Sequence, residues 1–333
     1  MAYADSFARD AQRLRDLYPR LNLSPMGTAV LANSSWPLNR ERLADLLGFD
    51  GLVVNSYDSG QIISMDVPLE AAGIAGSVAL RIGSLLQDIH VQYHQTRPWL
   101  LLEEGSTYTS SSMPQKRNPG VIMTARAKAS DVAASLQTIL LRLHNITPGM
   151  TDYKATYADA RTFVRGVEML QSFEGVLKAL RIHGPRGLEE LENDWTTSME
   201  LAETLQRLHG VPFRVGHSFA SAIVDHARAN NLLPKAFPYA DAVRIYVGSA
   251  QKYKQADTKL PLDEKTFRTT LSPEDMVRTR VGIGGPQPAE VRRMIAAAQK
   301  ALESDRTWLA ERDTKLLAAE AKLNNEFRKY LAN

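Results

Sequence analysis

The stretch from residue 69 to residue 97 reads LEAAGIAGSVALRIGSLLQDIHVQYHQTR. Its larger apolar side chains recur at steps of three and four residues, as they do on one face of an α-helix. They are Ile74, Val78, Ile82, Leu85, Ile89 and Tyr93. A stripe of this length predicts a long helix that packs one face against neighbouring helices.

Two stripes of the same kind follow. The first comprises Ala125, Ala129, Val132, Leu136, Ile139 and Leu143, and the second comprises Phe163, Val167, Leu170, Leu177 and Leu180. Three helices of this length, each with one apolar face, are expected to pack lengthwise. No run alternates between apolar and polar residues for more than a few positions, as a half-buried strand would. The sequence therefore predicts an all-α fold built on a bundle of long helices.

Two breaks rich in Gly and Pro, at 184–187 and 284–288, divide the chain. Shorter helices are predicted at about 196–208, 215–230, 237–256 and 273–280, with a last one at about 289–329. We therefore expect a central helical-bundle domain at 1–190 and a smaller helical domain at 191–333. The first twenty residues carry an amphipathic pattern, with Phe7, Ala11, Leu14 and Leu17 on one face. Since no capping box precedes them, we expect the first domain to be incomplete at its N-terminus.

Composition narrows the class of protein. The 333 residues are 44% hydrophobic and 23% charged, as is usual for a globular protein. The chain has no cysteine, which excludes disulfides and cysteine-ligated zinc, and fits a reducing compartment such as the cytoplasm. Its net charge of +3 comes from scattered residues, so no nucleic-acid partner is expected. No apolar run approaches the roughly 18 residues of a membrane helix, and the start does not resemble a signal peptide.

The segment between the first two long stripes is rich in groups that bind anions. Residues 104–120 contain six Ser or Thr residues and the cations Lys116 and Arg117. Asn118 and Pro119 are suited to the N-cap and first position of the helix that follows. A helix N-terminus with hydroxyls and a lysine nearby can hold an anion, and a loop of this length can close as a lid. The alternative is a solvated connector before a capped helix.

The stretch Thr109–Pro119, TSSSMPQKRNP, is similar to the signature Gly-Ser-Ser-x-Met-Pro-x-Lys-x-Asn-Pro of the fumarase/aspartase/argininosuccinate lyase superfamily. Every specified position matches except the first, where Thr109 stands for Gly. Other stretches resemble the argininosuccinate lyase branch and extend the resemblance along the whole chain. They are residues 25–32, 37–41, 47–49, 55–58, 210–214 and 284–285.

This resemblance implies a carbon–nitrogen lyase that releases fumarate from an N-succinyl compound by β-elimination. Ser110 would be the catalytic base, although Ser111 or Ser112 could take that role by a shift in register. Lys116 and Asn118 would hold the reacting carboxylate, with Ser111 and Tyr153 also binding the substrate. The alternative is that Lys116 is merely solvated, that Asn118 caps a helix and that Tyr153 stands at the start of a helix. The resemblance implies a homotetramer, and no cofactor or metal is expected.

Departures from the family's pattern bear on substrate and activity. If Tyr153 is in register, Ala158 and Arg161 replace a family Gln and Lys, and an upstream arginine is lost. These changes favour another amine than that of argininosuccinate, as in ethylenediaminedisuccinate (EDDS) lyases. No histidine lies in a motif matching the family's acid, and its upstream domain has no counterpart here. His90 and His94 could form half a metal site, but no third ligand is evident.

Three hypotheses follow from these departures. The chain is a lyase whose composite sites combine several subunits, and which is inactive as an isolated chain. Alternatively, it is a subunit that supplies the serine loop to a partner carrying the histidine. The third alternative is a non-catalytic structural protein on the same scaffold, as some lens crystallins are.

Overall fold

The computed structural model describes residues 1–144, 147 and 157–331. The chain divides into two compact units. The first unit comprises residues 1–94, 102–181 and 295–333, and the second comprises residues 95–101 and 182–294. Residues from 295 onward thus belong to the same unit as the N-terminal helices.

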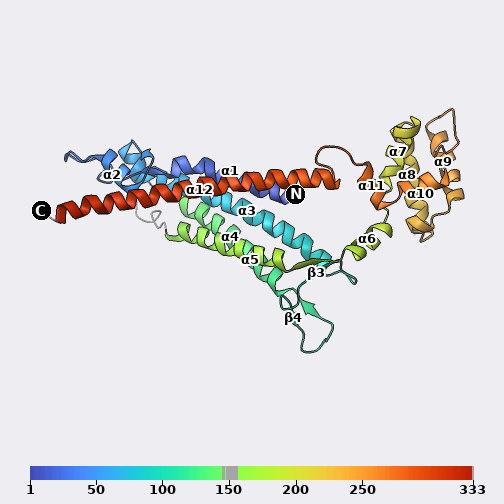
Figure 1. Cartoon of the computed structure of the whole chain (residues 1–333), viewed down its shortest axis with the longest axis horizontal. Helices are drawn as coiled ribbons and strands as arrows, with labels where there is room; N and C mark the ends of the chain where they lie inside the picture. The colour runs from blue at the N-terminus through green and yellow to red at the C-terminus, as the bar shows by residue number, and fades with distance from the viewer. Residues whose placement is uncertain (145–146, 148–156, 332–333) are drawn as a thin grey trace. The chain divides into compact units, whose positions relative to one another are not determined.

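In its described residues, the first unit consists of five long helices, one short helix and a few very short strands (Figure 1). Its helices are α1 (Ala2–Leu21), α2 (Arg40–Leu47), α3 (Ile63–Tyr93), α4 (Gly120–Leu143), α5 (Tyr157–Ala179) and most of α12 (Pro288–Leu331). The π-helical turn η1 (Asp58–Ile62) leads into α3. Strand β1 (Leu23–Ser24) pairs in parallel with β2 (Gly51–Leu52). Two further short strands, β3 (Leu100–Leu102) and β6 (Leu180–Ile182), lie where the chain passes from one unit to the other. The predicted all-α class is confirmed.

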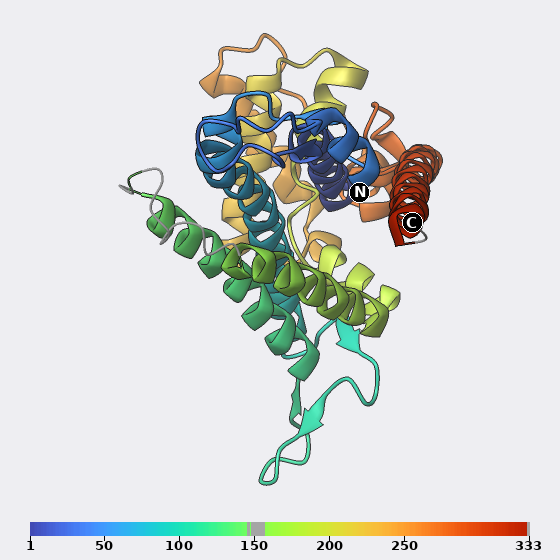
Figure 2. The same cartoon turned by 90° about the vertical axis from the view of Figure 1, so that its left-hand side faces the viewer.

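Helices α3, α4 and α5 lie lengthwise against one another (Figures 1 and 2). The predicted faces of α3 and α4 are largely the buried ones, with Ile82 and Val132 fully inaccessible to solvent. Burying such a side chain stabilises the fold by about 1.5–3 kcal/mol. Gly76 lets the two helices approach closely, because a Cβ at this position would lie 2.6 Å from Leu136 Cδ2.

The predicted face of α5 is wrong. Phe163, Val167, Leu170 and Leu177 are 40–53% exposed. The side chains that α5 buries lie on another face: Thr162, Met169, Phe173, Val176 and Ala179. Helix α5 therefore carries apolar side chains on two faces, and the described part of the chain covers only one of them. In α1, similarly, Leu17 is buried as expected, but Leu14 is 47% exposed.

The helical run Asp58–Tyr93 is the one helix, within the part of the chain that the structure describes, long and apolar enough to cross a membrane. That property concerns length and composition alone. In the first unit this run is a core helix, which buries Ile74, Ile82, Leu86 and Ile89, and core helices commonly meet the same criterion. The observation is weak evidence for a membrane span.

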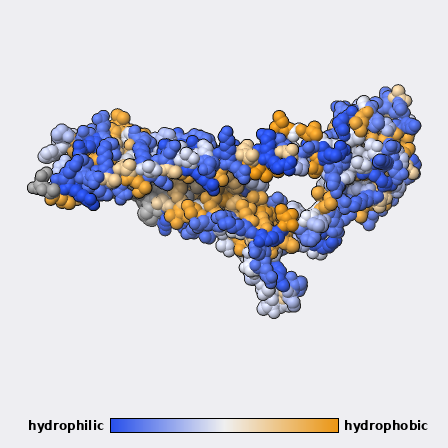
Figure 3. Space-filling model, viewed as in Figure 1, coloured by the Kyte–Doolittle hydropathy of each residue, from blue (hydrophilic) through white to orange (hydrophobic). Residues whose placement is uncertain are grey.

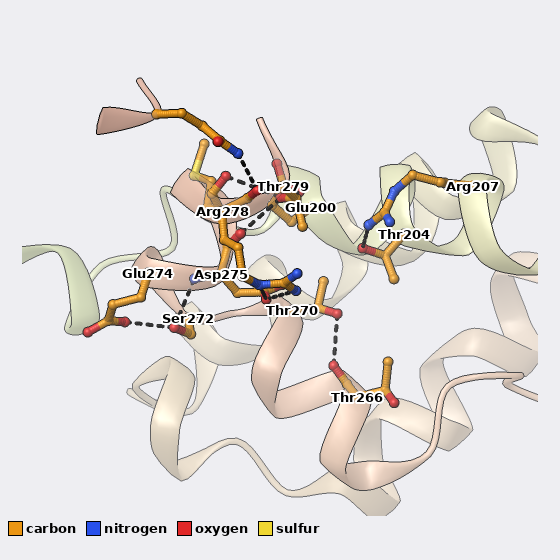
Figure 4. Close-up of polar contacts among 12 residues, drawn as sticks. Glu200, Thr204, Arg207, Thr266, Thr270, Ser272, Glu274, Asp275, Arg278 and Thr279 are labelled. Atoms are coloured by element: carbon orange, nitrogen blue, oxygen red, sulfur yellow. Dashed lines mark hydrogen bonds and ion pairs between the residues drawn. The ribbon is translucent and has the colours of Figure 1, made fainter. Parts of the chain in front are cut away.

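The second unit is a cluster of shorter helices. They are α6 (Gly184–Glu192), α7 (Met199–His209), α8 (Phe213–Ala229), the 3-10 turn η3 (Pro234–Ala236), α9 (Tyr239–Lys252), α10 (Glu264–Thr270) and α11 (Pro273–Thr279). Their core centres on Phe219, Phe237 and Phe267, all fully buried. Figure 4 shows polar contacts of α7, α10 and α11 in this unit; the contact between the Thr279 hydroxyl and the Glu200 carboxylate joins α11 to α7.

Three short helices, α2, α6 and α10, were not predicted. Each has a side-chain N-cap, from Asn39, His183 and Asp263 respectively. Residues 184–187 do follow the end of α5, as the expected break implies, but they are themselves helical and form the start of α6. The His183 Nδ1 atom accepts the Arg186 N–H at 3.1 Å, and Pro185 is tolerated in a first helical turn, where its missing N–H is not needed.

Candidate active site

The signature segment forms a two-stranded ribbon between α3 and α4 (Figure 1). Strand β4 (Tyr108–Thr109) pairs antiparallel with β5 (Arg117–Asn118), with Tyr108 opposite Asn118 and Thr109 opposite Arg117. The ribbon ends in a turn in which the Lys116 N–H donates to the Met113 carbonyl at 3.1 Å. Pro114 is the second residue of that turn, where its fixed φ is favourable. We call residues 108–118 the hairpin.

Ser110 lies directly after β4, and its hydroxyl oxygen accepts two backbone hydrogen bonds. The N–H groups of Ser112 and Met113 donate to Ser110 Oγ at 3.3 and 3.2 Å. The Ser112 hydroxyl is also 3.3 Å away. Donors fixed around an oxygen stabilise negative charge on it. Ser110 is half-buried, whereas Ser111 and Ser112 are exposed.

The two cations of the hairpin differ in their contacts. The Arg117 guanidinium donates to the carbonyls of Pro114 and Lys116, at 2.7 and 3.1 Å. It is thereby tied to the hairpin's own backbone. Lys116 is exposed, and within the described residues its ammonium group has no ion pair or hydrogen bond. Lys116 is therefore the cation of the hairpin that is available to an anionic ligand.

Asn118 does not cap a helix, so that part of the prediction is wrong. It lies in β5, and its side-chain amide donates to the Tyr108 carbonyl at 3.2 Å. The N-cap of α4 is Pro119, and no side chain caps this helix. Asn118 therefore fixes the base of the hairpin, with its side chain half-buried between the two strands.

Tyr153, the remaining predicted substrate contact, lies outside the described residues. Ser110, Ser111, Lys116 and Asn118 all belong to the hairpin and are brought together by it. Ala158 and Arg161, the two departures from the family's pattern that follow Tyr153 in the sequence, belong to α5.

A shallow hollow of about 410 Å³ lies where the hairpin meets the bundle. Side chains with hydroxyl groups line much of it: Ser106, Thr107, Tyr108, Thr124 and Ser172. Gly120 is tightly placed at its edge, since a Cβ there would lie 3.2 Å from the Tyr108 ring. Sequence reasoning missed Tyr108, Thr124 and Ser172, because only the first is near the signature and none belongs to it.

His90 and His94 are in contact, with 2.8 Å between their Nε2 atoms. The Arg126 guanidinium lies 3.0 Å from His90 Nδ1, so this nitrogen must accept and Nε2 must carry the proton. Burial, followed by His94 and Arg126, lowers the pKa of His90. Binding a metal through Nε2 needs the opposite arrangement, with Nε2 free and Nδ1 donating, and binding through Nδ1 needs that nitrogen free of Arg126. The pair is thus unsuited to a metal, and no cluster of three ligands occurs among the described residues.

The known proteins that this chain resembles include lyases. Residues 1–134 match the model of a protein family described as lyase. The argininosuccinate lyase of Methanothermobacter thermautotrophicus is 30% identical over 308 residues, which cover 92% of this chain. That of Methanocaldococcus jannaschii is 29% identical over 316 residues, or 91% of this chain. The chain spans 64% and 60% of the length of these two relatives.

Solved structures show the same likeness. An EDDS lyase variant with bound fumarate superposes with a TM-score of 0.88 at 27% identity, covering 99% of this chain and 64% of the other. A class II fumarase from Schistosoma mansoni, at 13% identity and a TM-score of 0.59 over 83% of this chain and 57% of its own, shares the fold. Signature, fold and relatives agree: the chain resembles the fumarase/aspartase superfamily and, within it, the argininosuccinate lyase-like members.

Proposed function

We propose that the chain is a carbon–nitrogen lyase that releases fumarate from an N-succinyl amino compound. One observation carries the proposal: Ser110 Oγ accepts two backbone N–H groups on the same hairpin that presents Lys116, whose ammonium group has no partner among the described residues. The backbone donors around Ser110 Oγ suit a catalytic base, and the Lys116 ammonium group suits a substrate carboxylate. The relatives named argininosuccinate lyase and the EDDS lyase with bound fumarate support the same reaction class.

In the proposed reaction, ionised Ser110 removes a proton from the carbon beside one carboxylate of the succinyl group. Negative charge accumulates on that carboxylate, and the Lys116 ammonium group stabilises it. The bond between the neighbouring carbon and nitrogen then breaks, its electron pair leaves with the amine, and fumarate remains. The departing amine takes a proton from a group outside the hairpin. Tyr153 and Ser111 are proposed as further substrate contacts.

The position of Asn118 narrows its proposed role. One N–H of its side-chain amide donates to the Tyr108 carbonyl. Asn118 would therefore hold the substrate carboxylate only with its remaining amide hydrogen, while it keeps the two strands together. A primary amide has two N–H groups, so one can bind the Tyr108 carbonyl while the other binds the substrate carboxylate.

A cytoplasmic homotetramer is the assembly that we propose. Its support is the apolar surface that the described residues leave exposed along α4 and α5, where Leu141 is 77% and Val164 57% exposed (Figure 3). Apolar patches of this kind on a long helix usually mark an interface. A second copy of the chain carries the same exposed apolar helix face, and two such faces can pack lengthwise against each other.

A partner-dependent subunit is the second candidate. The observation that favours it is the exposure of residues 111–117, which leaves the proposed site open on the hairpin. None of the seven histidines lies in a motif matching the family's acid. A second polypeptide would then supply the group that protonates the amine.

Fumarate absorbance tests these proposals together. The chain is incubated with argininosuccinate and with EDDS, alone and after mixing with a full-length relative whose signature serine has been changed to alanine. Fumarate from the chain alone supports an independent lyase, and fumarate only from the mixture supports the partner-dependent form. If a co-purifying mixed assembly and the chain alone both leave the substrates intact, the lyase proposal is wrong.

A further inference from the structure

Tyr93 connects the end of a core helix to the strand that carries the proposed substrate-binding residues. It is the last residue of α3, and its hydroxyl donates to the Arg117 carbonyl at 2.8 Å. Arg117 lies between Lys116 and Asn118 in the chain. The contact therefore holds the backbone at the residue next to Lys116, whose ammonium group is proposed to bind the substrate.

Tyr93 is well supported from behind. Its ring packs edge-on against His94, with 5.8 Å between centroids, and His94 packs in the same way against His90 at 4.4 Å. Arg126 of α4 anchors His90. Burial raises the pKa of Tyr93 above its ordinary value, against a smaller opposing effect of Arg117. The hydroxyl is thus a protonated donor on a side chain held by both neighbouring helices.

The hairpin itself has little else to fix it on this side. Its ladder consists of two residue pairs, and a ribbon this short is only marginally stable alone. Asn118 ties one strand to the other, and Tyr108 packs on Gly120 at the start of α4. These contacts hold the hairpin together and to α4. The Tyr93 hydroxyl adds an attachment to α3.

We propose that Tyr93 is a positioning residue: its hydroxyl fastens the Arg117 backbone to the end of α3 and so sets where Lys116 presents its ammonium group. The role assigned to Lys116 rests on the proposed function. The attachment of the hairpin by Tyr93 does not. Loss of the hydroxyl therefore loosens the hairpin whether or not the chain binds fumarate.

The test compares Tyr93→Phe with Tyr3→Phe in the full chain. Tyr3 makes a comparable hydroxyl contact, 3.3 Å from Ser84 Oγ, elsewhere in the same unit. Hydrogen exchange measured by mass spectrometry follows the amides of residues 108–118. We expect exchange there to rise roughly 2- to 12-fold in Tyr93→Phe, the range for one lost hydrogen bond. It should stay unchanged in Tyr3→Phe, with similar melting temperatures for both.

Fumarate affinity, measured by calorimetry, is the second readout. We expect it to weaken in Tyr93→Phe by a similar factor, and to be unaltered in Tyr3→Phe. Unchanged exchange of the hairpin in Tyr93→Phe overturns the inference, whatever the chain binds. Faster exchange together with a wild-type chain that does not bind fumarate leaves the positioning role intact and refutes the proposed function instead.

Discussion

Arg280 pairs with two carboxylates that differ in burial. It forms an ion pair with Glu200, whose side chain is 3% exposed, and another with Glu203, whose side chain is 40% exposed, at 3.1 Å. The Thr279 hydroxyl lies 3.3 Å from the Glu200 carboxylate (Figure 4). One guanidinium thus links α7 to the segment after α11 through a buried pair and an exposed pair.

Replacing Arg280 by methionine should strongly destabilise the second unit. The change leaves the Glu200 carboxylate buried without its cation, which typically costs about 3–5 kcal/mol. Glu203→Gln removes the exposed pair alone and should cost at most about 1 kcal/mol. Urea unfolding of the two variants measures the difference. Equal free energies of unfolding would show that the buried pair contributes no more than the exposed one.

Gly216→Ala should destabilise the same unit by overpacking. A Cβ at Gly216 of α8 would lie 2.8 Å from the Ala202 Cα and 3.1 Å from its carbonyl oxygen, so backbone must move. We expect a cost of about 1–3 kcal/mol. Gly248 in α9 is the control, because a Cβ there meets nothing within 4 Å. Gly248→Ala should raise stability by about 0.5–1 kcal/mol. A melting curve that shifts in the same direction for both variants would contradict this packing.

Glu290 should make the segment after α11 sensitive to acid. Hydrogen bonds from Arg293 first, and then from the Gly284 N–H, lower its pKa from 4.5 to about 2. Because the folded-state pKa is depressed, the stabilisation is complete above about pH 4.5 and is lost as the pH falls towards 2.

Glu290→Gln should therefore increase hydrogen exchange at Gly284 near neutral pH, by an amount that shrinks as both proteins approach pH 2. Glu303→Gln is the control, since Glu303 is exposed and its nearest cation, Arg306, is 3.6 Å away. An effect of Glu290→Gln that persists undiminished at pH 2 would rule out its ionised carboxylate as the cause.

The sequence predicts the long helices because their apolar residues keep the helical spacing of three and four residues over many turns. It identifies the buried faces of α3 and α4, where Ile82 and Val132 have no exposed surface. It fails for α5, where Val167 and Met169 lie on two apolar faces of one helix. Periodicity marks both faces as apolar, but it cannot tell which one the same chain covers.

The signature locates the proposed chemistry, but the local structure around it was not predicted. Strands of two residues leave no alternating pattern, so the pairing of Tyr108 with Asn118 is invisible in the sequence. That pairing also explains why Asn118 does not cap α4. The apolar stripe includes Tyr93 as one of the positions expected to be buried and predicts no polar role for it. A tyrosine in the last turn of a helix that leads into a polar loop was the available signal, because its hydroxyl can reach the loop's backbone.

Ser110→Ala should abolish fumarate release while leaving fold and binding intact. The change removes the proposed proton acceptor, and a positioned base typically contributes 10²–10⁴ in rate. Ser111→Ala is the control from the same segment, because its hydroxyl is exposed and belongs to the alternative register. Turnover is followed by fumarate absorbance in whichever assembly is active. A larger loss in Ser111→Ala than in Ser110→Ala would transfer the role of base to Ser111.

Lys116→Met should weaken both binding and turnover, since it removes the free cation of the hairpin and keeps a side chain of similar length. An ion pair or charged hydrogen bond to the substrate carboxylate is worth about 1.5–3 kcal/mol, so fumarate affinity should fall roughly 10- to 150-fold. Arg117→Met is the matched control: that guanidinium is bound to the carbonyls of Pro114 and Lys116, and its loss should alter hairpin stability more than affinity. Calorimetry with fumarate distinguishes the two. Comparable affinity losses in both variants would mean that the hairpin attracts anions by its overall charge, and the specific carboxylate contact of Lys116 would have to be abandoned.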